Sequence, residues 1–84
     1  MFFEPKIVRK ARKAGVQFEQ HWYAESPTTN RGCYCSTKED GIKYVGPDAI
    51  LSQAWKGYHK DFPHILAFGR SKVDCASRLM THFF

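Results

Sequence analysis

The chain has 84 residues, of which 43% are hydrophobic and 15% are aromatic. This length suits one small domain, and the composition excludes an intrinsically disordered chain. No apolar run approaches the roughly 18 residues that a membrane span needs, and the N-terminus lacks the apolar region of a signal peptide. We therefore expect a cytoplasmic protein that forms a single α+β domain over residues 1–84 and binds no membrane.

The formal net charge of +5 is concentrated at the N-terminus. Residues 1–15 contain five Lys and Arg against one Glu, whereas residues 16–84 contain eight Lys and Arg against seven Asp and Glu. This asymmetry indicates an acidic partner, and nucleic acid is one candidate for it. Five cations could follow a phosphate backbone: Lys6, Arg9, Lys10, Arg12 and Lys13.

The first element is predicted to be a short basic helix over residues 4–14. Pro5 suits the first helical position, and Gly15 suits the position just after the helix. Apolar residues from Ile7 to Ala14 fall on one side, and the cations cover the remainder. A helix this short is unstable alone, so the segment 1–15 must either dock on the domain or extend from it.

The next segments predict an antiparallel meander. Residues 16–25 alternate between apolar and polar side chains, which is typical of a half-buried strand. Residues 33–37 are predicted to form a short second strand. The segment Lys38–Gly41 is predicted to be a turn, from which residues 42–45 return as the third strand.

Residues 46–69 are predicted to contain the helix on which the rest of the chain packs. Five apolar residues recur there at spacings of one, three and four: Ile50, Leu51, Ala54, Trp55 and Tyr58. This spacing predicts an amphipathic helix over about residues 47–59. Pro63 blocks its continuation, and residues 65–68 form an apolar run that is typical of a buried strand.

A final helix is predicted over residues 71–84, with Ser71 as its N-cap and Asp74 in the reciprocal position. The expected order is therefore α-β-β-β-α-β-α, without internal repeats. If residues 42–45 and 65–68 share a sheet, the helix between them is a right-handed crossover that joins parallel strands. The predicted fold is a four-stranded mixed sheet with helices packed mainly on one face.

The cysteines and histidines predict neither a metal site nor a catalytic one. Cys33 and Cys35 are separated by one residue, closer than the pairs of structural zinc sites, and Cys75 lies in a different segment. The four histidines are scattered, and no phosphate-binding loop or nucleophile elbow accompanies them. We expect a protein that is not an enzyme, requires no cofactor or metal, and keeps its cysteines reduced.

The solvent face of the predicted sheet is the candidate site for a protein partner. It combines polar side chains with tyrosines, and Tyr and Arg are common anchors of protein interfaces. The loop of residues 26–32 could add further contacts. The candidate residues on this face and loop are His21, Tyr23, Arg31, Tyr34 and Lys43.

Together these features favour a small binding module that acts by protein–protein contact, as a regulator or inhibitor of a larger protein or complex. The alternative is a nucleic-acid-binding protein that uses the basic N-terminal helix. Apolar termini leave a homodimer open, since phenylalanine occupies positions 2, 3, 83 and 84. Small basic chains of this kind are also common among the products of mobile elements.

Overall fold

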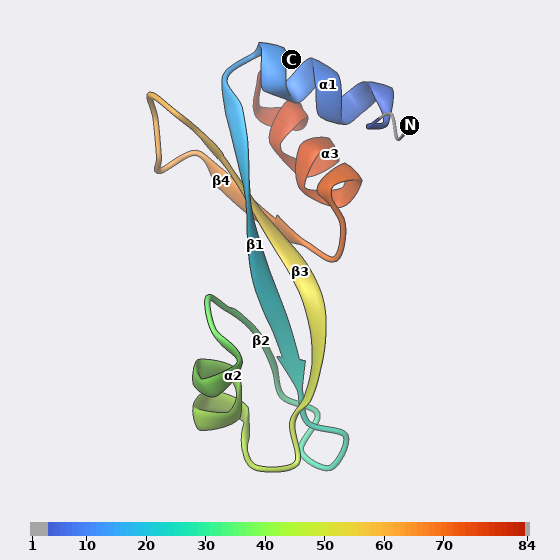
Figure 1. The fold of residues 1–84 in the computed structure, drawn as a ribbon, viewed down its shortest axis with the longest axis vertical. Coiled ribbons are helices and arrows are strands. Elements are labelled where there is room, and N and C mark those ends of the chain that lie inside the picture. The colour runs from blue at the N-terminus through green and yellow to red at the C-terminus, as the bar shows by residue number, and fades with distance from the viewer. Residues whose placement is uncertain (1–3, 84) are drawn as a thin grey trace. The chain divides into compact units, whose positions relative to one another are not determined.

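The computed structural model describes residues 4–83, and of His82 and Phe83 it describes the backbone only (Figure 1). Phe2, Phe3 and Phe84, which were considered for a homodimer contact, lie outside the described residues. The described elements are α1 (Lys6–Lys13), β1 (Val16–Glu25), β2 (Gly32–Cys35), α2 (Lys38–Val45), β3 (Ile50–His59), β4 (Leu66–Gly69) and α3 (Lys72–Phe83). The α+β class is confirmed, but the order is α-β-β-α-β-β-α.

The four strands form one antiparallel sheet in the order β2-β1-β3-β4. The short strand β2 pairs with the second half of β1, which places Tyr23 opposite Tyr34. The short strand β4 pairs with the second half of β3, which places Trp55 opposite Gly69. The prediction of a mixed sheet with a parallel crossover is wrong, because a hairpin joins β3 directly to β4.

The predicted helix over residues 47–59 is wrong, since strand β3 occupies this segment. The buried residues of β3 are Ala54, Gly57 and His59, whose spacings of three and two depart from the strict alternation of a strand. A spacing of three is also typical of a helix. Gly57 shows what the strand requires. A Cβ at Gly57 would lie 2.8 Å from Cδ1 of Leu79, so only glycine allows α3 to pack this closely on β3.

The predicted turn at Lys38–Gly41 and strand over residues 42–45 are also wrong, because helix α2 covers both. Thr37 is its N-cap, with Oγ1 accepting a hydrogen bond from the backbone N–H of Asp40 at 3.1 Å. Gly41 is buried inside the helix, where a Cβ would lie 2.9 Å from that of Ala24. The glycine therefore serves helix packing and not a turn.

The remaining elements lie close to their predicted positions. Strand β1 has the predicted limits, and α1, β2, β4 and α3 differ from the predicted ranges by one or two residues at their ends. Ser71 caps α3 as predicted, because its Oγ accepts from the backbone N–H of Asp74 at 3.1 Å. The packing of the helices mainly on one face of the sheet stays a prediction.

The structure contains a repeat that the sequence analysis did not find. After α1, the order long strand, short strand and helix occurs twice at an interval of 34 residues. The paired first residues are Val16 and Ile50, Gly32 and Leu66, and Lys38 and Lys72. The chain is therefore an N-terminal helix followed by two ββα repeats.

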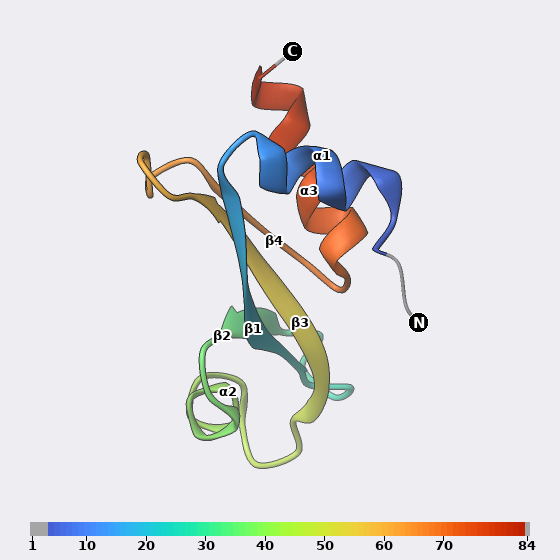
Figure 2. The same ribbon diagram turned by 45° about the horizontal axis from the view of Figure 1, so that its top comes forward.

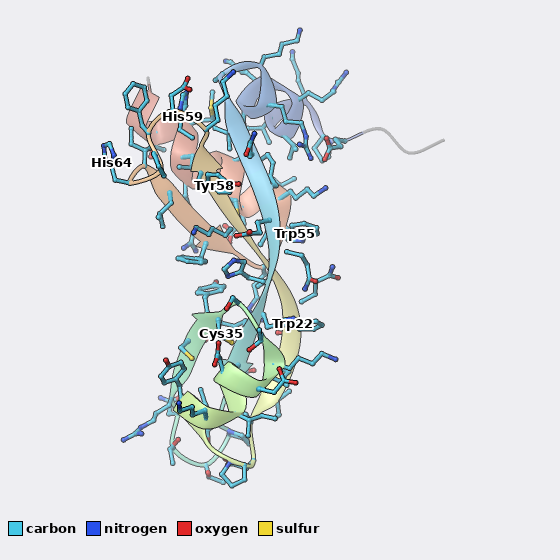
Figure 3. All side chains as sticks on the ribbon, turned by 60° about the vertical axis from the view of Figure 1, so that its left-hand side comes forward. Trp22, Cys35, Trp55, Tyr58, His59 and His64 are labelled. Carbon is cyan, nitrogen blue, oxygen red and sulfur yellow. The ribbon has the colours of Figure 1, made fainter. Side chains whose placement is uncertain are left out.

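The two repeats share a contact as well as an element order. In each, the first helical lysine lies over a tryptophan of the long strand. The Nζ atom of Lys38 is 4.5 Å from the ring centroid of Trp22, and that of Lys72 is 4.6 Å from the centroid of Trp55 (Figure 3). Each such cation–π contact is worth about 0.5–1 kcal/mol at an exposed site, so it fixes the start of each helix on its own strand.

The chain divides into two compact units, each with its own core. Unit 1 comprises residues 4–19 and 55–83 of the described chain, and unit 2 comprises residues 20–54. The buried core of unit 1 consists of Val8, Ala11, Val16, Ala76, Leu79 and Met80. That of unit 2 consists of Ala24, Cys35 and Val45. Within residues 4–83, no helix is long and apolar enough to cross a membrane.

Candidate basic interface on the first helix

Helix α1 is docked against α3 and does not extend away from unit 1 (Figure 2). Val8 and Ala11 are completely buried in the core that α3 supplies, with Ile7 packed beside them. The carbonyl of Pro5 accepts hydrogen bonds from the backbone N–H groups of Val8 and Arg9. Packing on one side therefore fixes which side of α1 faces solvent.

Four of the five predicted phosphate-binding cations lie together on the exposed side of α1. They line one open depression of about 280 Å³, and we call them the basic face: Lys6, Arg9, Lys10 and Lys13. All four are exposed. Their spacings of three, four and seven residues bring them onto neighbouring turns of one helix face. The structure therefore brings together four of the five cations that the sequence singled out, and their role in binding stays a prediction.

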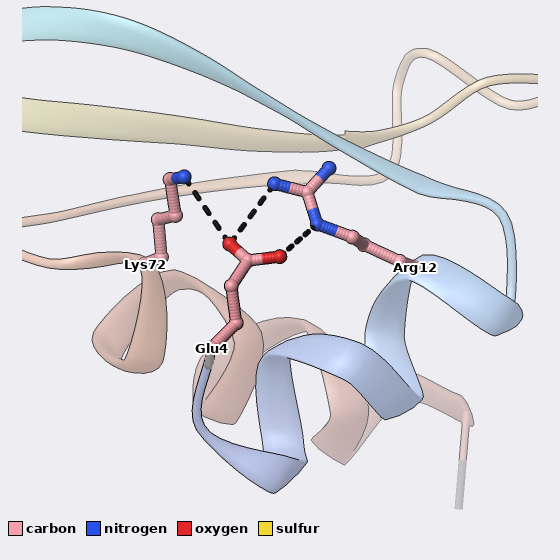
Figure 4. A network of polar contacts seen from close by, with 3 residues as sticks. All are labelled: Glu4, Arg12 and Lys72. Carbon is pink, nitrogen blue, oxygen red and sulfur yellow. Dashed lines mark hydrogen bonds and ion pairs between the residues drawn. The ribbon is translucent and has the colours of Figure 1, made fainter. Parts of the chain in front are cut away.

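The fifth cation, Arg12, is directed to an ion pair with Glu4 (Figure 4). Its Nε lies 2.6 Å from Oε1 of Glu4, and its Nη2 donates to Oε2 at 3.1 Å. Nζ of Lys72, from the start of α3, donates to the same Oε2 at 3.2 Å. Arg12 also lies over the Phe18 ring, 5.0 Å from its centroid. Arg12 thus holds α1 in place and is not a member of the basic face.

Glu4 and Lys72 were missed by sequence reasoning, which had no signal to link residues 68 positions apart. The hydrogen bond from Arg12, with that from Lys72 adding to it, lowers the pKa of Glu4 to about 2 against the opposing effect of desolvation. The carboxylate therefore stays ionised through the acid range in which an ordinary glutamate takes up a proton.

Glu4→Gln is expected to reduce the acid sensitivity of the protein. The pKa of Glu4 is lower in the folded state than in the unfolded state. The ionised carboxylate therefore stabilises the fold fully above about pH 4.5, and this stabilisation is lost as the pH falls towards 2. At neutral pH the substitution should lower the free energy of unfolding by about 0.5–1 kcal/mol, as expected for exposed ion pairs.

Urea unfolding at neutral pH and at a pH below 4.5 measures this difference. Glu4→Gln should reduce the difference in the free energy of unfolding between the two pH values. The control Glu39→Gln, on the exposed surface of α2, should leave that difference as in the wild type. An equal gap in all three proteins would show that the Glu4 network does not contribute.

Of the residues predicted to bind a protein partner, the structure brings Tyr23 and Tyr34 together. Their rings are directly opposite on β1 and β2, with centroids 4.9 Å apart, and both are half-buried. The Tyr23 side chain lies against Gly32, because a Cβ at this glycine would be 2.3 Å from the tyrosine hydroxyl. The absence of a side chain at Gly32 thus leaves room for the tyrosine hydroxyl.

The other three predicted residues do not join this pair on a solvent-exposed sheet face. His21 is only 8% exposed, so its side chain is buried and does not lie on a solvent face. Lys43 is exposed but lies on α2, because the segment predicted as the third strand is helical. Arg31 is exposed in the loop before β2, where its carbonyl accepts from the backbone N–H of Ser26.

That loop is tied down by Asp48. Its Oδ2 accepts hydrogen bonds from the hydroxyls of Thr28 at 2.6 Å and Ser26 at 2.9 Å, and both bonds lower the pKa of the carboxyl. The backbone N–H of Thr29 donates to the Ser26 hydroxyl, which closes the turn. The loop therefore presents Arg31 from a defined conformation.

Two of the three cysteines are part of the protein interior. Cys35 and Cys75 are buried, and their thiols donate to the carbonyls of Trp22 and Trp55 respectively. Burial raises the pKa of Cys75 to about 11, so this thiol stays protonated. Among the described residues, no group of three or more His, Cys, Asp and Glu side chains could hold a metal ion.

The two units differ strongly in charge. Unit 1 carries ten Lys and Arg against four Asp and Glu, whereas unit 2 carries three against four. No protein-family model, curated protein or solved structure matches this chain. The function is therefore inferred from the charge and geometry of the chain itself.

Proposed function

We propose that the protein is a non-enzymatic binding module that contacts nucleic acid through the basic face of α1. The observation that carries this proposal is the grouping of four exposed cations on one side of a helix whose other side is fixed on α3. A phosphate backbone gains affinity from each cation that displaces a condensed counterion. Free thiols at all three cysteines support a reducing, cytoplasmic location.

The surroundings of the basic face favour an anionic partner. Unit 1 contains six more basic than acidic residues, ten against four, so its field attracts a polyanion from a distance. The nearest acidic side chain on the same segment, Glu4, is occupied by Arg12 and Lys72. Four phosphate contacts predict that the logarithm of affinity falls with the logarithm of salt concentration with a slope of about −3 to −4.

Fluorescence anisotropy with a labelled mixed-sequence oligonucleotide, measured over a series of salt concentrations, tests the proposal. The triple variant Arg9→Gln, Lys10→Gln, Lys13→Gln is expected to bind more weakly and to flatten the slope by about 2–3. The double variant Arg31→Gln, Lys43→Gln removes exposed cations of unit 2 and is expected to retain the wild-type slope. An unchanged slope in the triple variant would refute the assignment.

A second candidate function is protein–protein contact through Tyr23 and Tyr34, as a regulator of a larger protein. The paired, half-buried rings and the nearby exposed Arg31 favour it, because such residues are common anchors of interfaces. A pull-down in the presence of nuclease and high salt should lose its partner in the variant Tyr23→Ala, Tyr34→Ala. The control Tyr44→Ala removes a tyrosine of α2 that is 66% exposed. Retention of the partner by both variants would exclude the tyrosine pair.

A further inference from the structure

An apolar hollow adjoins the basic face between α1 and α3. It has a volume of about 340 Å³ and is lined by Lys6, Ile7, Lys10 and Met80. Its surface is mostly apolar, and Ile7 and Met80 are the apolar side chains that line it. Lys6 and Lys10 border both this hollow and the basic depression, so one ligand could reach both.

We propose that this hollow accepts an unpaired nucleobase, so that the protein prefers single-stranded to duplex nucleic acid. The inference rests on the proposed function of the basic face. With phosphates on Lys6 and Lys10, the attached base would lie against Ile7 and the thioether of Met80. Bases of a duplex are stacked and paired, whereas those of a single strand can turn out onto a protein surface. A methionine sulfur against an aromatic ring adds a favourable contact.

The shape and length of the site favour a nucleic-acid strand over other anionic amphiphiles. The hollow is open to solvent, so it can cover only one side of its occupant. A flat base can rest on it with one face, whereas an acyl chain would keep much of its apolar surface in water. Lys6 and Lys13 are seven positions apart, so the basic face extends over about 10 Å of helix. At the roughly 3.4 Å phosphate spacing of one strand in a duplex, about three phosphates fall over that distance. The repeated charge of a strand therefore matches the cations along α1.

Anisotropy measurements with three ligands test this inference on the whole protein. They are a single strand, the same sequence as a duplex, and a strand of equal length whose units carry no bases. The abasic strand has the charge of the normal strand, so it isolates the contribution of the bases. We expect the normal strand to bind roughly tenfold more tightly than the abasic strand, and more tightly than the duplex at high salt, where charge contributes less.

A pair of variants locates the effect. Ile7→Ser makes the lining of the hollow polar and should remove the preference for the normal strand over the abasic strand. The preference is the ratio of the two affinities, so a general weakening of phosphate binding by the variant does not affect it. Ile42→Ser makes the same change at an exposed position of α2, in unit 2, and should keep the preference. Circular dichroism checks that both variants fold. The comparison of normal and abasic strands with the wild-type protein needs no variant and decides the question alone.

The outcomes separate this inference from the proposed function. Equal binding of the normal and abasic strands would overturn the base site and leave phosphate binding by α1 intact. Tighter binding of the duplex at high salt would also overturn it. Failure to bind any of the three ligands at low salt would refute the proposed function of the basic face itself.

Discussion

Replacing Leu79 with alanine is expected to lower the free energy of unfolding by about 2–5 kcal/mol. Leu79 is completely buried and is the largest such side chain among the described residues. Its Cδ1 lies against the backbone of β3 at Gly57, which offers no side chain that could move into the space. A cavity that cannot collapse places the cost towards the upper end of this range.

Urea unfolding followed by circular dichroism measures this loss. The matched control is Val73→Ala on the same helix, where the side chain is 38% exposed and the expected cost is below about 1 kcal/mol. Because Leu79 shares its core with Val8 and Ala11, its loss should also weaken the docking of α1 and with it the proposed binding of nucleic acid. A cost for Leu79→Ala as small as that for Val73→Ala would contradict the packing of unit 1.

Replacing Gly15 with alanine is expected to destabilise the protein by about 1–3 kcal/mol. Gly15 has a φ of +101°, a conformation that side chains with a Cβ rarely adopt. A Cβ there would also lie 2.7 Å from Nε2 of His59. That ring cannot withdraw easily, because Nε2 donates to the Ala14 carbonyl at 2.8 Å and Nδ1 accepts from the backbone N–H of Asp61 at 3.1 Å.

Gly46→Ala is the matched control for Gly15→Ala. Gly46 has a φ of +131°, but the nearest atom to its Cβ would be Oδ1 of the exposed Asp48, at 3.2 Å. Both substitutions place a Cβ on a residue with positive φ, which strains the backbone. Only the substitution at Gly15 also brings that Cβ into a clash with the buried His59 ring. Thermal unfolding should therefore show the larger loss for Gly15→Ala. If the two losses are equal, the close contact between Gly15 and His59 is refuted.

Local signals predicted the elements that depend on neighbouring residues. The alternation of residues 16–25 gave β1 its correct limits, and Ser71 with Asp74 marked the start of α3. The cations of α1 form one face because residues three, four and seven positions apart share a helix side. Such features follow from backbone geometry over one or two turns, so they can be read along the chain.

The errors lie where distant residues decide the local structure. Gly41 was predicted to end a turn, and Gly57 lies in the segment that was predicted to be helical. Each is instead the place where a neighbouring element packs directly on the backbone. The segment of β3 has apolar residues at helical spacing, and its pairing with β1 and β4 outweighs that local preference. The two ββα repeats depend on residues 38–45 being a helix and residues 50–59 being a strand, so the predicted elements concealed them.

The sequence alone thus determined the α+β class, the position of β1, and the concentration of positive charge on one face of the first helix. Tertiary structure decided that Arg12 turns to Glu4 and away from this face, and that Met80 of α3 comes to lie beside Ile7 of α1. The physical reason is distance along the chain. Spacing fixes which side chains share a helix face, whereas only packing brings together residues separated by most of the sequence.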